Sequence, residues 1–181
     1  DTAGFAETLK ASRFDSLISG DTPLVIVNDA FRPTPTRAVL SRIQEIYPDF
    51  AADFIIACGN HPAPDQDDMA KIFEGYSVPT GSSVFVHNSR DIDTMTKVGT
   101  IDDNPVYINN KLFDYSALIV IGSVEPHYFA GFTGGRKSIV PGLCDIDTTR
   151  RNHALAVSPD AQPLRLEGNP VAEHLNRMLS M

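Results

Sequence analysis

Short runs of aliphatic residues recur along the chain and are separated by more polar stretches. Four of these runs predict strands, at 23–27, 53–58, 83–87 and 117–121. Their hydrophobicity is continuous rather than alternating, which is typical of strands buried on both faces, as in parallel sheets. A further pair of strands is predicted over 98–108, with a turn near 102–104.

Apolar residues at helical spacing occupy the segments between these strands. They predict one or two short helices over 2–17, helices at about 37–47, 65–73 and 146–157, and a last helix that starts at Asn169 and Pro170. We expect Thr34 or Thr36 to cap the 37–47 helix. The apolar faces that we expect are Val39, Ile43 and Ile46 on that helix and Val171, Leu175 and Leu179 on the last one.

The alternation of strands and helices predicts a single α/β domain over residues 1–181. We expect a Rossmann-like parallel sheet with helices on both faces. Right-handed crossovers then bring the carboxyl ends of several strands to one edge of the sheet, where ligands bind in such folds.

Composition narrows the classes of protein that fit. The chain has a formal net charge of −8, which argues against nonspecific binding to nucleic acid or to anionic membranes. No apolar run approaches the roughly 20 residues that span a bilayer. Two cysteines, Cys58 and Cys144, form no disulfide framework, so we expect buried or site-lining thiols in a reducing compartment, the cytoplasm.

Polar residues follow three of the predicted strands. Asp29 and Arg32 come after the first, His61 after the second, and His127 and Lys137 after the strand at 117–121. The predicted topology brings these widely separated residues to one edge, so we expect a site there.

A glycine-rich segment at 125–142 is the strongest single indication of a site. Gly131, Gly134 and Gly135 allow the backbone to approach a bulky ligand with free N–H groups. Lys137 is interpreted either as a point charge for phosphate or as an amine for covalent attachment. The spacing from Gly131 to Lys137 does not match the phosphate-binding loop of kinases.

Other interpretations of these residues stay open. The segment 28–35 is either a turn with a helix cap or a site in which Arg32 binds a carboxylate or phosphate and Asp29 accepts a hydrogen bond. His61 is either structural or functional, and His153 is either a surface residue or a functional one. His87 and His174 are interpreted as structural or surface residues.

Five motifs in order along the chain carry a family resemblance: DAFRPTP at 29–35, GNH at 59–61, PHYFAGFTGGRK at 126–137, PG at 141–142 and NH at 152–153. In these motifs the chain resembles the nickel-dependent lactate racemase family. The long glycine motif with the later Asn-His is the specific part. Phe31 departs from the pattern, since the family commonly has threonine before the arginine.

The resemblance implies a role for each of these residues. It implies that Lys137 carries a nickel-pincer nucleotide derived from a pyridinium mononucleotide, and that His153 binds its nickel. His61 and His127 are then the acid–base pair, and Arg32 binds substrate. The cofactor-binding residues that we expect besides Lys137 are Asp29, Thr133, Gly134 and Gly135.

The implied activity is racemisation or epimerisation of a 2-hydroxy acid by hydride transfer. The implied partners are that substrate, the enzymes that build the cofactor, and a C-terminal domain, because family members are longer than this chain. We therefore expect residues 1–181 to be the cofactor-binding N-terminal domain of a two-domain racemase, inactive without its second domain. Two other hypotheses are a non-catalytic domain that binds a nucleotide or an anionic metabolite, and a role in cofactor handling or regulation.

Overall fold

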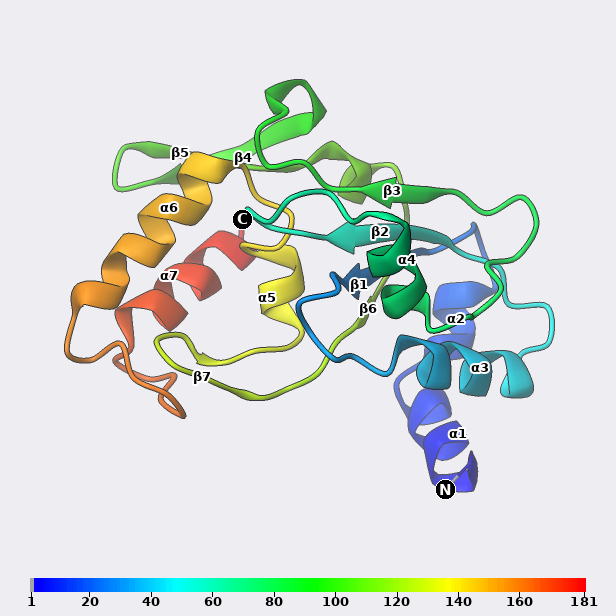
Figure 1. Ribbon diagram of the computed structural model, residues 1–181. Coiled ribbons are helices and arrows are strands. Elements are labelled where there is room, and N and C mark those ends of the chain that lie inside the picture. Colours follow the sequence, from blue (N-terminus) through cyan, green and yellow to red (C-terminus); the bar gives the residue numbers. More distant parts are fainter. Residues whose placement is uncertain (1) are drawn as a thin grey trace.

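A four-stranded parallel sheet forms the centre of the fold (Figure 1). The computed structural model describes residues 2–181, with side chains from residue 4 onward. The strand order is β3-β2-β1-β6, and the strands are β1 (Leu24–Asn28), β2 (Asp53–Ala57), β3 (Val84–Val86) and β6 (Leu118–Ile121). Ile26 of β1 lies opposite Ile55 of β2 and Val120 of β6. The predicted parallel α/β sheet is confirmed.

Side chains of β1 alternate between two hydrophobic cores, one on each face of the sheet. Leu24 and Ile26 belong to one core, and Val25 and Val27 belong to the other. All five residues of β1 are buried. This explains why residues 24–27 of the strand are all apolar instead of alternating with polar residues.

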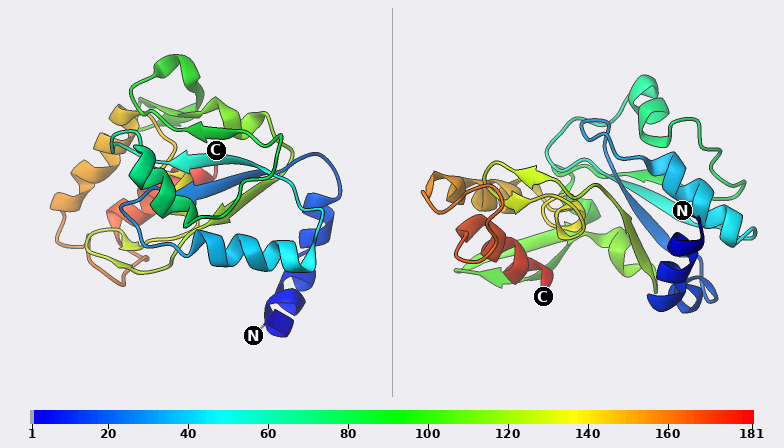
Figure 2. Two further views of the ribbon diagram at one scale, coloured as in Figure 1. Left: turned by 45° about the vertical axis from the view of Figure 1, so that its right-hand side comes forward. Right: turned by 90° about the horizontal axis from the view of Figure 1, so that it is seen from below.

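One face of the sheet is covered by the N-terminal helices (Figure 2). These are α1 (Thr2–Ala11), α2 (Phe14–Ile18), α3 (Thr36–Ile46) and α4 (Gln66–Phe73). Phe14, Leu40 and Phe73 pack in one cluster with Val25 and Val27 of β1. The predicted helices at 2–17, 37–47 and 65–73 are therefore present.

The opposite face carries the C-terminal helices and an antiparallel ribbon (Figure 2). These elements are α5 (Arg136–Ile139), α6 (Ile146–Ala154), α7 (Pro170–Leu179), β4 (Met95–Ile101) and β5 (Asn104–Asn109). Helices thus cover both faces, as the sequence predicts. Short 3₁₀ turns occupy Ile92–Thr94, Asn110–Phe113 and Leu155–Val157. The last of these completes the helix that was expected to continue to residue 157.

The predicted cap of α3 is wrong. Pro35 occupies the cap position and no side chain bonds to the free N–H groups there. The Thr34 hydroxyl instead accepts a hydrogen bond of 2.8 Å from the Asn28 side chain, so it is committed to the loop after β1. Thr36 is already the first helical residue.

The predicted apolar faces need two corrections. In α3 the buried apolar residues are Leu40 and Ile43, whereas Ile46 is only half-buried. In α7 Leu179 is 47% exposed and Met178 is buried in its place. Residues 171, 175 and 178 follow the i, i+4, i+7 spacing of one helical face, and residue 179 falls beside it.

The glycine-rich segment contains elements that the sequence did not predict. Two short strands, β7 (Pro126–His127) and β8 (Gly131–Phe132), pair antiparallel, and α5 follows at once. Gly131 allows this because its φ is +79° and a Cβ atom would lie 2.2 Å from the Arg165 carbonyl oxygen.

Both cysteines are buried and free, as expected. Within residues 2–181, no helix combines the length and the apolar character that crossing a bilayer requires.

Candidate active site

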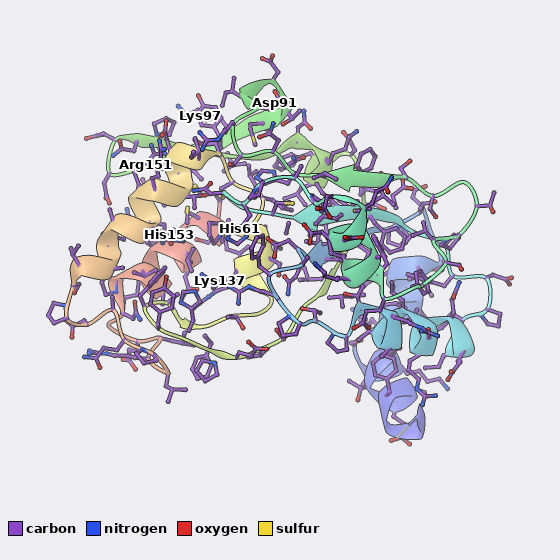
Figure 3. The ribbon with its side chains drawn as sticks, in the orientation of Figure 1. His61, Asp91, Lys97, Lys137, Arg151 and His153 are labelled. Atoms are coloured by element: carbon purple, nitrogen blue, oxygen red, sulfur yellow. The ribbon has the colours of Figure 1, made fainter. Side chains whose placement is uncertain are left out.

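A cavity of about 430 Å³ opens where the ends of β1 and β2 meet the glycine-rich segment and α6. Seven of the residues predicted for the site line it, namely Asp29, Arg32, His61, His127, Gly134, Lys137 and His153. Figure 3 shows His61, Lys137 and His153 together beside α5. Thr133 and Gly135 are outside the lining, and their predicted contact with a cofactor stays a prediction.

The loop after β1 is held by the buried side chain of Asn28. Its amide nitrogen donates to Thr34 Oγ1 at 2.8 Å, and its carbonyl oxygen accepts from Ser138 Oγ at 3.0 Å. The first bond shapes the loop that carries Asp29 and Arg32. The second bond ties that loop to α5, the helix of Lys137.

Asp29 and His61 form a close pair at the mouth of the cavity. The Asp29 carboxylate is buried, and its Oδ2 lies 2.5 Å from Nδ1 of His61, whose side chain is half exposed. The Phe31 ring lies 4.5 Å from the His61 ring. Phe31, the departure from the family pattern, therefore packs on the imidazole and helps to fix its plane.

His127 is buried deeper, on β7. Its Nδ1 accepts hydrogen bonds from the backbone N–H groups of Ala130 at 3.2 Å and of Phe129 at 3.4 Å. Burial, reinforced by the positive charges of Lys137 and Arg32, lowers the pKa of His127 to about 4. The imidazole is therefore neutral at physiological pH.

Lys137 lies in the first turn of α5, with its ammonium 5.6 Å from the centre of the Phe129 ring. Burial lowers the pKa of Lys137 to about 8, helped by the charges of Arg32 and Arg136. At pH 7 about a tenth of the amine is then unprotonated, far more than for a lysine with the ordinary pKa of 10.5. Such an amine is a nucleophile, which is the property that covalent attachment of a ligand requires.

His153 projects from the last turn of α6. Burial lowers the pKa of His153, and the charges of Lys137 and His61 act in the same direction. A neutral imidazole is the form that binds a metal ion. The helix itself is fixed at its start by Asp145, whose carboxylate accepts from backbone N–H groups of the first turn.

Phe129 is a site residue that sequence reasoning missed. Its ring lies 4.5 Å from the His127 ring, 5.2 Å from the His153 ring and under the Lys137 ammonium. It therefore separates and orients three functional side chains. Within the sequence it is one aromatic among several in the long motif, and nothing distinguishes it from a core phenylalanine.

Positive charge dominates this cavity although the protein as a whole is acidic. Among the described residues, no carboxylate forms an ion pair with Arg32 or Lys137. These two cations in the lining of one cavity favour an anionic ligand such as a carboxylate or a phosphate. The imidazoles of His61 and His127 add ring nitrogens that can donate or accept a hydrogen bond to such a ligand.

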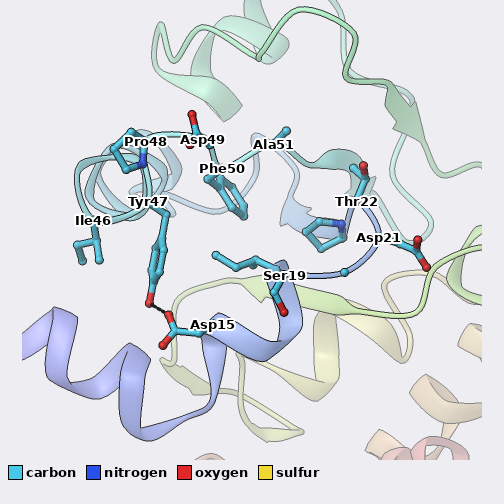
Figure 4. Close-up of a pocket in the computed structure, with 13 residues that line it drawn as sticks. Asp15, Ser19, Asp21, Thr22, Ile46, Tyr47, Pro48, Asp49, Phe50 and Ala51 are labelled. Atoms are coloured by element: carbon cyan, nitrogen blue, oxygen red, sulfur yellow. Dashed lines mark hydrogen bonds between the residues drawn. The ribbon is translucent and has the colours of Figure 1, made fainter.

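Another hollow, of about 560 Å³, lies at the opposite end of the sheet, where β1 and β2 begin (Figure 4). Its main polar contact is internal, because the Tyr47 hydroxyl donates to the Asp15 carboxylate. It contains neither histidine nor lysine nor arginine. It thus lacks the groups for proton transfer or anion binding that the cavity around Lys137 contains.

Comparison with known proteins identifies the family. Residues 3–163 match the model of the lactate racemase N-terminal domain. The chain belongs to this family. It is 32% identical over 167 residues to a lactate racemase of Thermoanaerobacterium thermosaccharolyticum and 28% identical over 169 residues to one of Lactiplantibacillus plantarum. The matches cover 88% and 89% of this chain, but only 39% and 40% of the relatives.

Solved structures agree with the fold. The lactate racemase apoprotein from T. thermosaccharolyticum aligns with a TM-score of 0.78 at 30% identity, over 91% of this chain and 41% of that one. A Thermotoga maritima protein aligns with a TM-score of 0.80 over 99% of this chain and 47% of that one, and its 20% identity shows the fold alone. The resemblance and the fold class predicted from the sequence are thus both confirmed.

Membership in this family does not by itself assign a role to each residue of the cavity. The structure brings seven of the predicted residues to one cavity, while their roles toward substrate, cofactor and nickel stay predictions. Among residues 2–181, no group of three or more His, Cys, Asp or Glu side chains is arranged to hold a metal ion.

Proposed function

We propose that this protein is a 2-hydroxy-acid racemase or epimerase of the lactate racemase type. The observation that carries the proposal is the convergence of Lys137, His153, His61 and His127 on one cavity. A domain that only binds an anion does not need three imidazoles and an amine of lowered pKa in the same cavity. The names of the relatives supply the reaction class, and the chain spans about 40% of their length.

The residues present fit the implied nickel-pincer nucleotide. Lys137 offers an amine with a pKa of about 8 for a covalent linkage, and His153 offers an imidazole of lowered pKa for nickel. The cavity volume of about 430 Å³ is in the range of small-molecule and cofactor sites. When bound, the cofactor would supply a centre that accepts the hydrogen of substrate carbon 2 as hydride and returns it.

The side chains of this domain perform the remaining tasks. Arg32 binds the substrate carboxylate through its guanidinium fork. One histidine accepts the hydroxyl proton as carbon 2 loses its hydrogen with both bonding electrons, which leaves a planar 2-keto acid. The hydrogen then returns to the opposite face of carbon 2 while a proton is supplied to the keto oxygen. The product is the 2-hydroxy acid of opposite configuration. His61 and His127 serve the two hands of the substrate.

The proposal includes partners and a location. Cofactor-building enzymes supply the nucleotide, and a second, C-terminal domain closes over the cavity and excludes water. The aromatic side chain of Tyr128 is 77% exposed at the cavity and offers this domain an apolar surface. The free thiols of Cys58 and Cys144 favour a cytoplasmic location.

A second candidate function is the binding of a nucleotide or anionic metabolite without catalysis. The unpaired cations Arg32 and Lys137 favour it, because they suit an anion whatever the chemistry that follows. Such a protein has no use for nickel, so the metal distinguishes the two candidates.

Nickel retention tests the proposal. The full-length protein is produced together with cofactor-building enzymes, and its nickel content after extensive dialysis is compared with that of His153→Ala. We expect the variant to lose nickel while its circular dichroism spectrum and Tm stay close to those of the parent. His174→Ala is the matched control, since His174 lies outside the cavity. Retention of nickel by His153→Ala contradicts the assignment.

A further inference from the structure

We propose that the two histidines of the site are held in opposite tautomers, and that Asp29 is the positioning residue that fixes one of them. In His61 the hydrogen resides on Nδ1, so Nε2 accepts a proton. In His127 the hydrogen resides on Nε2, so Nε2 donates. The catalytic meaning of this arrangement rests on the proposed function, whereas the tautomers are properties of the chain itself.

The tautomer of His61 follows from its partner. The Asp29 carboxylate only accepts hydrogen bonds, and its Oδ2 lies 2.5 Å from Nδ1 of His61. A contact this short requires a hydrogen on Nδ1. Nε2 is then the nitrogen left for a ligand in the cavity that His61 lines. Burial of the carboxylate strengthens the pairing, because little water competes for Asp29.

The tautomer of His127 follows from its backbone contacts. The N–H groups of Ala130 and Phe129 both point at Nδ1, at 3.2 and 3.4 Å, and an N–H group only donates. Nδ1 of His127 therefore bears a lone pair, and the hydrogen of the neutral ring is on Nε2. The lowered pKa of His127 agrees with a ring that stays neutral.

The two histidines thus present different groups to a substrate. His61 is ready to take the hydroxyl proton at Nε2, and the imidazolium that forms is stabilised by Asp29. His127 offers an N–H donor to a substrate oxygen. To act as a base, His127 must first move its hydrogen to Nδ1, which breaks both of its backbone hydrogen bonds. The resting site is therefore complementary to the hand of substrate whose hydroxyl group faces His61.

His87 provides an internal reference for the same measurement. Its Nε2 lies 2.9 Å from the Cys144 carbonyl oxygen, which only accepts, and its Nδ1 lies 3.2 Å from the Asn109 amide nitrogen, which only donates. His87 is therefore fixed with its hydrogen on Nε2. It is buried and does not line the cavity around Lys137.

The test is a long-range ¹⁵N–¹H correlation spectrum of the full-length protein, labelled with ¹⁵N-histidine and prepared without cofactor, at about pH 8. Histidine-to-glutamine variants assign the signals. We expect His127 to show the same pattern as His87, with hydrogen on Nε2, and His61 to show the opposite pattern. Hydrogen on Nε2 of His61, or on Nδ1 of His127, overturns the proposal.

The role of Asp29 is tested by Asp29→Ala, measured in the same way. Alanine has no acceptor for the Nδ1 hydrogen, so we expect His61 to move its hydrogen to Nε2 while the His87 signals stay in place and report an intact fold. The control is Asp65→Asn, which removes an exposed charge four residues from His61 and keeps the cap on the Asp68 N–H group. An unchanged His61 tautomer in Asp29→Ala excludes Asp29 as the positioning residue.

These outcomes are separate from the fate of the proposed function. Opposite tautomers in a protein that never acquires nickel leave this inference standing and remove the racemase proposal. If both histidines have the same tautomer in a protein that retains nickel through His153, the racemase proposal stands and this inference is overturned.

Discussion

Ser138 donates a hydrogen bond of 3.0 Å to Asn28, although 110 residues separate them. Asn28 ends β1 and Ser138 lies one residue after Lys137 on α5. Through this bond the loop that carries Asp29 and Arg32 is joined to the helix that carries the amine. The two halves of the cavity are thereby held in one arrangement.

Replacing Asn28 by alanine is expected to destabilise the fold and loosen the site. The change leaves the Ser138 and Thr34 hydroxyls without their buried partner, which costs about 1–3 kcal/mol. Urea denaturation measures the loss. Asn60→Ala is the control, because Asn60 is exposed at the same cavity, and its effect should stay within about 0.5 kcal/mol. Equal stability of Asn28→Ala and Asn60→Ala contradicts the bridging role.

The amine of Lys137 is expected to react as a group with a pKa of about 8. Competitive acetylation of the cofactor-free protein across a pH range, read by peptide mass spectrometry, gives the midpoint. Arg32→Gln should raise that midpoint, since the Arg32 charge disfavours the ammonium form. Arg37→Gln, which removes an exposed arginine from α3, should not. A midpoint near the ordinary 10.5 in the parent protein would show that burial of Lys137 does not act as described.

Gly131 is expected to tolerate no side chain. Gly131→Ala meets the Arg165 carbonyl oxygen at 2.2 Å in addition to the strain of a φ of +79°. Gly75→Ala has nearly the same φ, +77°, and open space around the new Cβ atom. We expect about 1 kcal/mol of destabilisation at Gly75 and about 1–3 kcal/mol more at Gly131, measured by denaturation. Equal losses at the two positions refute the close approach of β8 to the 159–168 loop.

His87 makes stability depend on pH with a defined sign. Burial lowers the pKa of His87 to about 4 from 6.5, so the unfolded chain takes up its proton first as the pH falls. The contribution of His87 to the free energy of unfolding is therefore lost as the pH falls from 6.5 to 4, at about 1.4 kcal/mol per pH unit for this one proton. His87→Gln lacks this contribution. The stability difference between parent and variant should narrow by about 2 kcal/mol from pH 8 to pH 5, and parallel curves contradict the account.

The sequence predicts the elements whose pattern is local. Branched runs predict β1, β2 and β6, and the order of strands and helices predicts which polar ends meet. The cap of α3 could not be predicted, because Thr34 bonds to Asn28 only once the loop after β1 is folded. Phe129 acquires its place among three functional groups through tertiary packing alone.

The pairing of Asp29 with His61 shows the same limit. Both residues were expected at the site, but Asp29 was predicted to bind cofactor, and the hydrogen bond between residues 32 apart depends on the register of β1 and β2. Residue type and topology predict which side chains gather at an edge. Their hydrogen-bond partners depend on atomic distances that no spacing in the sequence encodes.

The racemase proposal depends above all on covalent attachment of the cofactor to Lys137. Its most direct test is the intact mass of the full-length protein, produced together with cofactor-building enzymes, followed by peptide mapping. We expect a nucleotide-sized adduct on the peptide that contains Lys137, and none in Lys137→Arg. An unmodified Lys137 under these conditions would contradict the racemase proposal and favour a domain that binds an anionic metabolite without catalysis.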